Sequence, residues 1–161
     1  MLVKAGRIAE DIFANVPDGE AVPEGAAIVS LKRFLAEGEA LLGRGAPLGV
    51  RLESEENPEV LGARVHGLAV VVLAVPKFRD GRAFSWARLL RTRMGYKGEV
   101  RVTGHVLRDQ YAFYARVGVD AFEITQNLSM EEFQAAMTEI SEVYQPAPDG
   151  KTTIWEKRRG R

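Results

Sequence analysis

Three cationic side chains, Lys77, Arg79 and Arg82, lie in the loop that follows the most apolar segment of the chain. This loop leads into a predicted helix, and the N-terminus of a helix presents free N–H groups and a partial positive charge. Such a loop can bind an oxyanion or a phosphorylated ligand. In the simpler alternative, Asp80 caps the helix and the arginines are solvated or ion-paired. Ligand binding and local structure therefore both remain open as roles for the loop.

A second candidate region follows the predicted strand that ends at residue 103. His105 comes directly after Gly104, and Asp109 follows four residues later. A neutral histidine near a carboxylate could act as a general base or a proton relay, so Asp109 and His105 are candidates for catalysis. In the alternative reading, His105 bonds to the backbone where a helix starts, and Asp109 caps that helix.

The positions of these loops predict a common site. Ligands of parallel α/β folds bind at the carboxyl ends of the strands, and the predicted strands end near residues 75, 103 and 125. We therefore expect the three following turns to meet. The predicted anion-binding residues are Lys77, Arg79, Asp80, Gly81, Arg82, Ser85, Arg88, Arg108 and Gln110.

Residues for metal or cofactor chemistry are scarce. The chain contains no cysteine, which excludes disulfides, iron–sulfur clusters, thiolate zinc sites and thiol catalysis. Its two histidines, His66 and His105, are too far apart in the sequence to suggest a metal site. No glycine-rich dinucleotide motif, P-loop or nucleophile elbow is present, so the sequence shows no evident cofactor site.

Charge is balanced overall but unevenly distributed. The chain has 161 residues, with 22 Lys and Arg against 22 Asp and Glu. Residues 76–116 carry 10 basic and 3 acidic side chains, whereas residues 117–150 carry 7 acidic and no basic ones. The basic segment would create a local positive field, unless acidic helix faces neutralise it within the fold. The zero net charge argues against nucleic-acid binding.

Hydropathy points to a cytoplasmic protein without membrane segments. The longest apolar run, Gly67 to Pro76, is much shorter than the ~20 residues that span a bilayer. Residues 1–14 include Glu10 and Asp11 and lack the apolar stretch of a signal peptide.

Apolar periodicity predicts strands that alternate with helices. The clearest strand is 68–75, which is apolar on both faces, as in a buried parallel strand. Ser30 and Ser129 are typical helix N-caps. Other predicted strands cover 26–29, 47–52, 99–103, 120–125 and, less regularly, 151–155. Predicted helices cover 31–42, 58–65, 83–94, 106–117 and 130–144.

This order predicts an α/β fold with a mostly parallel sheet of about five strands. The sheet could be open, with helices on both faces, or form half of a βα-barrel. A half-barrel would have to pair, for example in a homo-oligomer, or stay open. The expected organisation is an N-terminal arm or short strand pair over 1–25, a single α/β domain over 26–148, and a basic tail over 149–161.

Long blocks of the chain match one known pattern in the same order. They are Pro76–Arg91, Gly95–Glu99, Gly104–Gln110, Gly118–Glu123 and Tyr144–Ala147. On these blocks the chain resembles a bacterial family called domain of unknown function 934. Members are commonly described as oxidoreductases involved in sulfite reduction, and are typically encoded beside the sulfite reductase haemoprotein. The family defines no catalytic residues.

The sequence differs from the family pattern at Thr103, His105 and Val117, where alanine, often aspartate, and cysteine or a similar residue are expected. The resemblance therefore favours the Asp80-Gly81-Arg82 and Arg108-Asp109-Gln110 blocks over His105 as shared site residues.

Three functions remain in competition. The first is an accessory role in assimilatory sulfite reduction, in which the protein docks on the haemoprotein. The second is a small α/β enzyme or sensor for a phosphorylated or sulfated molecule. The third is nucleic-acid binding through residues 76–116. Whether any reaction is catalysed stays open.

Overall fold

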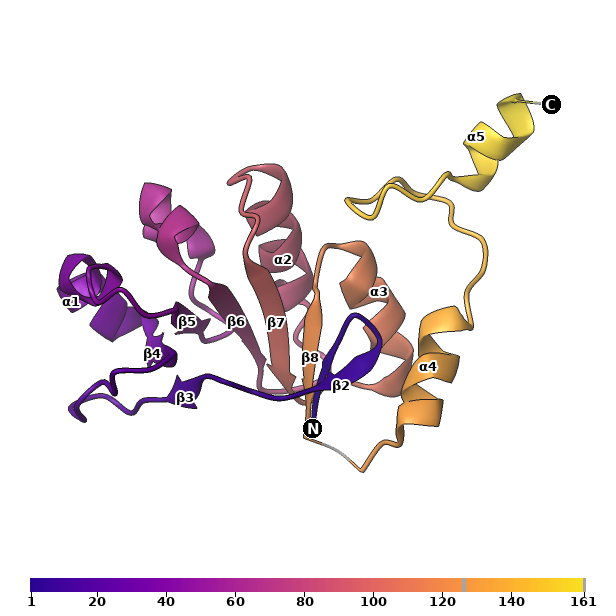
Figure 1. Ribbon diagram of the computed structural model, residues 1–161. Coiled ribbons are helices and arrows are strands. Elements are labelled where there is room, and N and C mark those ends of the chain that lie inside the picture. The colour runs from indigo at the N-terminus through magenta and orange to yellow at the C-terminus, as the bar shows by residue number, and fades with distance from the viewer. Residues whose placement is uncertain (126, 161) are drawn as a thin grey trace.

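The computed structural model of the protein describes residues 1–125 and 127–160, so Arg161 of the predicted tail lies outside the described residues (Figure 1). The strands are β1 (Leu2–Lys4), β2 (Arg7–Ala9), β3 (Ala14–Asn15), β4 (Ala27–Ser30), β5 (Leu48–Leu52), β6 (Val70–Val75), β7 (Glu99–Gly104) and β8 (Ala121–Ile124). The α-helices are α1 (Leu31–Leu42), α2 (Arg82–Thr92), α3 (Tyr111–Arg116), α4 (Met130–Thr138) and α5 (Ile154–Arg159). Two 3₁₀ helices are η1 (Pro58–Gly67) and η2 (Arg108–Gln110).

The eight strands of the described residues form one sheet in the order β2-β1-β8-β7-β6-β5-β4-β3. Strands β3 to β8 pair in parallel, whereas β1 pairs antiparallel with both β2 and β8. The α/β class is confirmed. The prediction of about five mostly parallel strands is wrong, because the sheet is mixed and residues 1–15 add three short strands to it.

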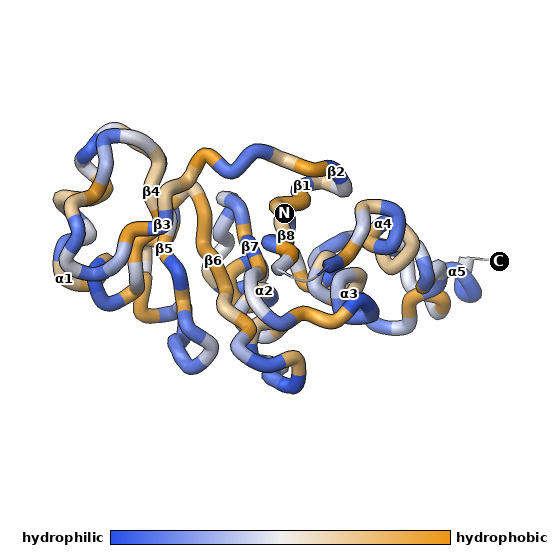
Figure 2. Tube along the Cα trace, turned by 90° about the horizontal axis from the view of Figure 1, so that it is seen from below, coloured by the Kyte–Doolittle hydropathy of each residue, from blue (hydrophilic) through white to orange (hydrophobic). Residues whose placement is uncertain are grey.

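The path of the chain forces this sheet to curl. Strands β2 and β3 lie at opposite edges of the sheet, yet only residues 10–13 connect them. Five residue steps of about 3.3–3.6 Å reach about 18 Å, whereas a flat sheet of this size would be about 33 Å across at about 4.8 Å per strand. The sheet is therefore a curled half-barrel, which Figure 2 shows as a trough bridged by this segment.

The two faces of the half-barrel have different cores. Val71, Leu73 and Val75 of β6 belong to the large apolar core that includes side chains of the helices. Val70 and Val72 point to the concave face, where they pack with Ile28 and with Phe13 of the connecting segment. Every residue of β6 is buried, as the sequence predicts for this strand.

The connecting segment, residues 10–13, is fastened to the concave face by a buried cation. Arg101 on β7 has only 2% of its side chain exposed and binds Asp11 at 2.7 Å and Glu99 at 2.8 Å. Burial alone would lower the pKa of Arg101, but the hydrogen bonds to the two carboxylates outweigh it and raise the pKa. Lys4 also binds Glu99, at 2.6 Å. The carboxylates thus neutralise the two cations.

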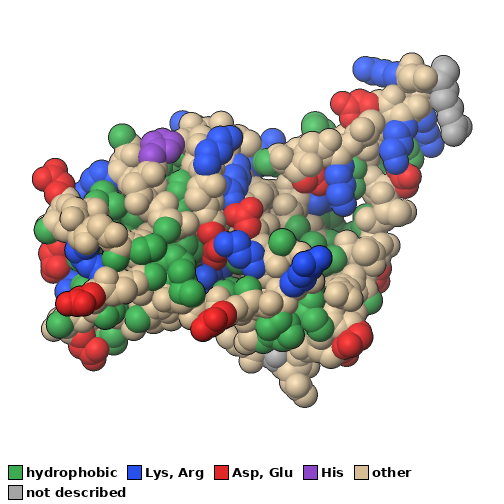
Figure 3. Space-filling model, in the orientation of Figure 1, with side chains coloured by type: hydrophobic (Ala, Val, Ile, Leu, Met, Phe, Trp, Pro, Cys, Tyr) green, Lys and Arg blue, Asp and Glu red, His purple; other side chains and the backbone are tan. Residues whose placement is uncertain are grey.

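Ion pairs also tie the basic segment 76–116 to the acidic segment 117–150. Arg108 binds Glu139 at 2.9 Å, and Arg116 binds Asp149 at 3.1 Å. Arg91 of α2 pairs with Asp120, which precedes β8. Figure 3 shows basic and acidic side chains interspersed over one face of the molecule. Acidic neighbours therefore neutralise part of the local positive field.

The C-terminal residues form a helix where the sequence predicts a strand over 151–155. Thr153 and Glu156 make a capping box, in which the Thr153 hydroxyl accepts from the Glu156 N–H and the Glu156 carboxylate accepts from the Thr153 N–H. This local pattern starts α5, which extends away from the sheet (Figure 1). Within residues 1–125 and 127–160, every helix is too short or too polar to span a bilayer.

We expect Asp11→Ala to lower the free energy of unfolding by about 1–3 kcal/mol, because it leaves a buried guanidinium group with one partner fewer. Glu10→Ala, on the same segment but at an exposed residue without an ion pair among the described residues, should change it by no more than about 0.5 kcal/mol. Urea denaturation measures both variants. Equal effects of the two substitutions would show that the Asp11–Arg101 pair does not hold this segment.

Candidate functional site

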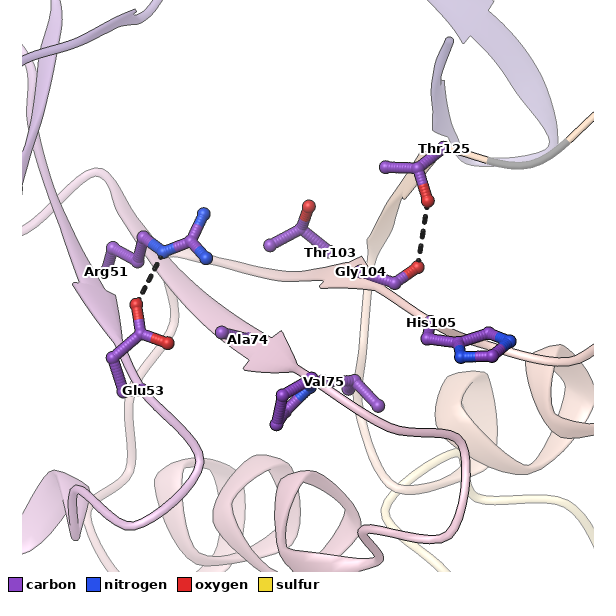
Figure 4. A pocket seen from close by; sticks show the side chains of 9 residues that line it. Arg51, Glu53, Ala74, Val75, Thr103, Gly104, His105 and Thr125 are labelled. Atoms are coloured by element: carbon purple, nitrogen blue, oxygen red, sulfur yellow. Dashed lines mark hydrogen bonds and ion pairs between the residues drawn. The ribbon is translucent and has the colours of Figure 1, made fainter.

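The turns at the carboxyl ends of the central strands meet at one cavity of about 500 Å³ (Figure 4). Pro76 follows β6, His105 follows β7 and Thr125 follows β8. All three line the cavity, which confirms the prediction that these turns come together. The remaining wall includes Arg51 and Glu53 from the end of β5.

Close backbone packing fixes the floor of this cavity. Gly104 has a φ of +106°, and a Cβ atom at this position would lie 2.4 Å from the carbonyl oxygen of Val75. The N–H of His105 donates to the same carbonyl at 2.7 Å. The Thr125 hydroxyl donates to the Gly104 carbonyl at 3.0 Å. These contacts hold the ends of β6, β7 and β8 together.

Arg51 is the cation of this cavity, and the sequence reasoning missed it. Its Nε donates to Glu53 at 2.9 Å, and 43% of its side chain is exposed. No other hydrogen bond from the Arg51 guanidinium occurs among the described residues, so its two terminal nitrogens are free to bind a ligand. In Figure 4 the guanidinium lies on the same side of the sheet as the Thr103 hydroxyl.

A signal for Arg51 existed in the sequence. The strand predicted over 47–52 is apolar at Leu48, Val50 and Leu52 and charged at position 51. In a strand, alternate residues point to opposite faces. The apolar residues face the large core beneath the helices, so the charged residue between them points to the opposite, concave face.

The two candidates for catalysis occupy different places. His105 lines the cavity, with its ring edge against Phe78 at a centroid distance of 5.6 Å. Asp109 is an exposed residue in the first turn of η2 and is not among the cavity-lining residues of the described chain. The structure therefore does not bring the two side chains together in this cavity.

The cationic loop after β6 is organised by an ion pair. Arg82 binds Asp80 through Nη2 at 2.7 Å and through Nε at 2.9 Å, and it also donates to Ser54 at 2.9 Å. Asp80 accepts from the Arg82 N–H at 3.2 Å, next to the start of α2. The hydrogen bonds from Arg82 hold the pKa of Asp80 well below its usual range. These contacts match the ion-paired alternative for Arg82, whereas the N-cap of α2 is Gly81 and not Asp80.

Other predicted anion-binding residues serve as links or lie at the surface. Gln110 accepts from the Leu107 N–H at 3.0 Å and donates to the Phe78 carbonyl at 2.9 Å, which joins two of the loops. Exposed members of the predicted set are Lys77, Arg79, Gly81, Arg82, Ser85, Arg88 and Arg108. Arg79 stacks over the Phe78 ring at 5.4 Å.

The predicted set is thus split between separate places. Arg88 lines a larger cavity, of about 870 Å³, between α2, α3 and the C-terminal segment. Arg108 pairs with Glu139. None of the nine predicted residues is among the described residues that line the cavity at Arg51. In the described part of the chain, no group of three or more His, Asp and Glu side chains is placed to hold a metal ion.

The backbone requirement at Gly104 can be tested directly. Gly104→Ala should lower the free energy of unfolding by more than about 2 kcal/mol, because the methyl group meets the Val75 carbonyl and the positive φ disfavours alanine. Gly81→Ala is the matched control, since its φ is −81° and a Cβ there meets open space. It should change stability by no more than about 1 kcal/mol. If both variants unfold at the same denaturant concentration, the close approach does not matter.

The Asp80–Arg82 pair predicts a specific pH dependence. Because the folded-state pKa of Asp80 lies below its ordinary value of 3.8, the pair stabilises the fold fully above that value and loses its effect as the pH falls below it. The stability difference between the wild type and Asp80→Asn should therefore shrink from about pH 6 to about pH 3. Urea denaturation at each pH measures it. A difference that stays constant would contradict the assignment.

The comparisons with curated proteins and with solved structures give no match. A family model described as "Bacterial protein of unknown function (DUF934)" matches residues 49–155. This range runs from the second residue of β5 through β8 and includes the residues that line the cavity at Arg51. The chain therefore belongs to this family of bacterial proteins.

Proposed function

We propose that this protein binds a small oxyanion in the cavity at the carboxyl ends of β5 to β8, and that it acts as an accessory in assimilatory sulfite reduction. The observation that carries the binding proposal is Arg51, whose terminal nitrogens face this cavity without a partner among the described residues. The cavity, of about 500 Å³, falls in the size range of small-molecule sites.

The geometry of the guanidinium group suits an oxyanion. Glu53 engages Nε and so orients the plane of the group, which leaves the N–H donors of the two terminal nitrogens for a ligand. A planar fork of this kind binds two oxygens of a sulfate, sulfite or phosphate group at once. The Thr103 hydroxyl, which lines the same cavity, offers a further donor.

Because the cations near the cavity are paired with carboxylates, the direction of the hydrogen-bond donors matters more for ligand binding than the overall positive potential. Glu53 compensates the charge of Arg51, and Asp80 compensates that of Arg82. Binding would therefore depend on directed hydrogen bonds rather than on a strong positive potential. This favours a small ligand that fits the guanidinium fork over a long polyanion such as nucleic acid.

The role in sulfite reduction comes from the family resemblance. Members of this family are typically encoded beside the sulfite reductase haemoprotein, and on that basis we propose that the two proteins dock. The chain has no cysteine and no dinucleotide motif, which supports an accessory role over that of a reductase. Sulfite and sulfate are therefore the first anions to test, with phosphate for comparison.

Arg51→Gln should weaken the binding of these anions about tenfold or more, because it removes a charged bidentate donor. Isothermal titration calorimetry with sulfite, sulfate and phosphate measures the effect. Arg93→Gln is the control, since Arg93 is an exposed residue at the end of α2 that pairs with Glu59. Unchanged binding in Arg51→Gln would overturn the site, as would the absence of binding in the wild type.

The same variant tests the biological role. In a strain whose own gene is deleted, the wild-type chain should restore growth on sulfate better than Arg51→Gln does. Unimpaired growth of the deletion strain on sulfate would overturn the proposed place in sulfite reduction.

A further inference from the structure

Arg51 also lines a second cavity, of about 410 Å³, which lies toward the neighbouring strand β4 rather than toward β6. This cavity lies over the end of β4 and the segment that follows β3. Its polar lining consists of Asn15, Asp18, Ser30 and Arg51. Val16 and Ile28 contribute an apolar wall. The guanidinium group of Arg51 therefore borders two cavities with different chemistry.

Strand pairing places these groups beside the guanidinium. Ser30 on β4 and Arg51 on β5 are direct neighbours in the parallel register, so their Cα atoms are about 4.8 Å apart. Strand β3 pairs with β4 through Asn15 and Ile28, and the Val16 N–H donates to the Ile28 carbonyl at 2.9 Å. This pairing brings the following turn, which includes Asp18, over Ser30.

Hydrogen bonds leave Asp18 with free acceptor capacity. The Ser30 hydroxyl donates a hydrogen bond to Asp18 Oδ1 at 2.6 Å and accepts one from the Arg33 N–H at 3.1 Å. Asp18 Oδ2 has no hydrogen bond among the described residues. An ionised carboxylate only accepts hydrogen bonds, so a group that binds here must be a donor. A second anionic group would be repelled.

We propose that the ligand is an oxyanion monoester that carries hydroxyl groups, with its oxyanion on Arg51 and its hydroxyl groups against Asp18. This inference rests on the proposed function, since it takes the anion site at Arg51 as given. The Asn15 amide both donates and accepts, as a hydroxyl does, whereas an ammonium group only donates. Asn15 and Asp18 together therefore favour a hydroxylated ligand over an amine.

The test compares two esters that differ only in their hydroxyl groups. Glycerol 3-phosphate and propyl phosphate share a three-carbon chain and a phosphate group. Wild-type protein should bind glycerol 3-phosphate at least fivefold more tightly than propyl phosphate. The ratio of the two affinities isolates the hydroxyl contacts, because any change in the field at the phosphate affects both esters alike.

Two variants connect this ratio to Asp18. Asp18→Ala should bring the ratio close to one, and Asp18→Asn should lower it while it keeps an acceptor for Ser30. Glu20→Ala is the matched control, since this exposed carboxylate lies two residues away and does not line the cavity in the described chain. Its ratio should equal that of the wild type. Circular dichroism confirms that each variant is folded.

The outcomes separate this inference from the proposed function. Equal binding of the two esters by the wild type overturns the hydroxylated-ester inference, as does a ratio that Asp18→Ala leaves unchanged. If inorganic phosphate still binds and Arg51→Gln weakens it, the anion site stands without the ester preference. If sulfite, sulfate, inorganic phosphate and both esters all fail to bind, the proposed function itself fails.

Discussion

The structure depends on a length constraint: residues 10–13 must join strands at opposite edges of an eight-stranded sheet. So short a segment can do this only if the sheet curls, and the curl creates the concave face. Phe13 and Asp11 then pack onto Val70 and Arg101 in the trough of the half-barrel, as Figure 2 shows for the path of the chain. The segment crosses the open side of the half-barrel. The cavity at Arg51 remains beyond it, at the carboxyl ends of the strands.

Two arginines on the concave face show how burial decides the role of a charge. Arg101 is almost fully buried and bonded to Asp11 and Glu99, so its charge stabilises the connecting segment. Arg51 is half-exposed and uses only Nε within the described chain. A buried guanidinium without partners would cost several kcal/mol, whereas an exposed one retains solvent as a partner that a ligand can replace. Of these two arginines, Arg51 is therefore the one suited to bind a ligand.

Local signals in the sequence predicted much of the fold. The caps at Ser30 and Ser129 are confirmed by their hydrogen bonds to the N–H groups of Arg33 and Glu132, because capping depends on residues three positions apart. Strands β1 to β3 were not predicted individually, since segments of two or three residues are too short for periodicity to show. Their pairing with distant strands is also not encoded locally. For the site, the order of the predicted strands was enough to predict that three turns meet. It did not indicate that Arg82 bonds to both Asp80 and Ser54.

The cationic residues near the site show why charge counts alone mislead. Arg82 is bonded to Asp80, and Arg108 and Arg116 are bonded to acidic residues of the following segment. Part of the excess positive charge over residues 76–116 is thus neutralised in ion pairs that link neighbouring loops and helices. These links position the turns that line the cavity, as Gln110 does when it donates to the Phe78 carbonyl. Arg82, Arg108 and Arg116 therefore help to build the framework, whereas Arg51 on β5 keeps its terminal nitrogens free toward the cavity.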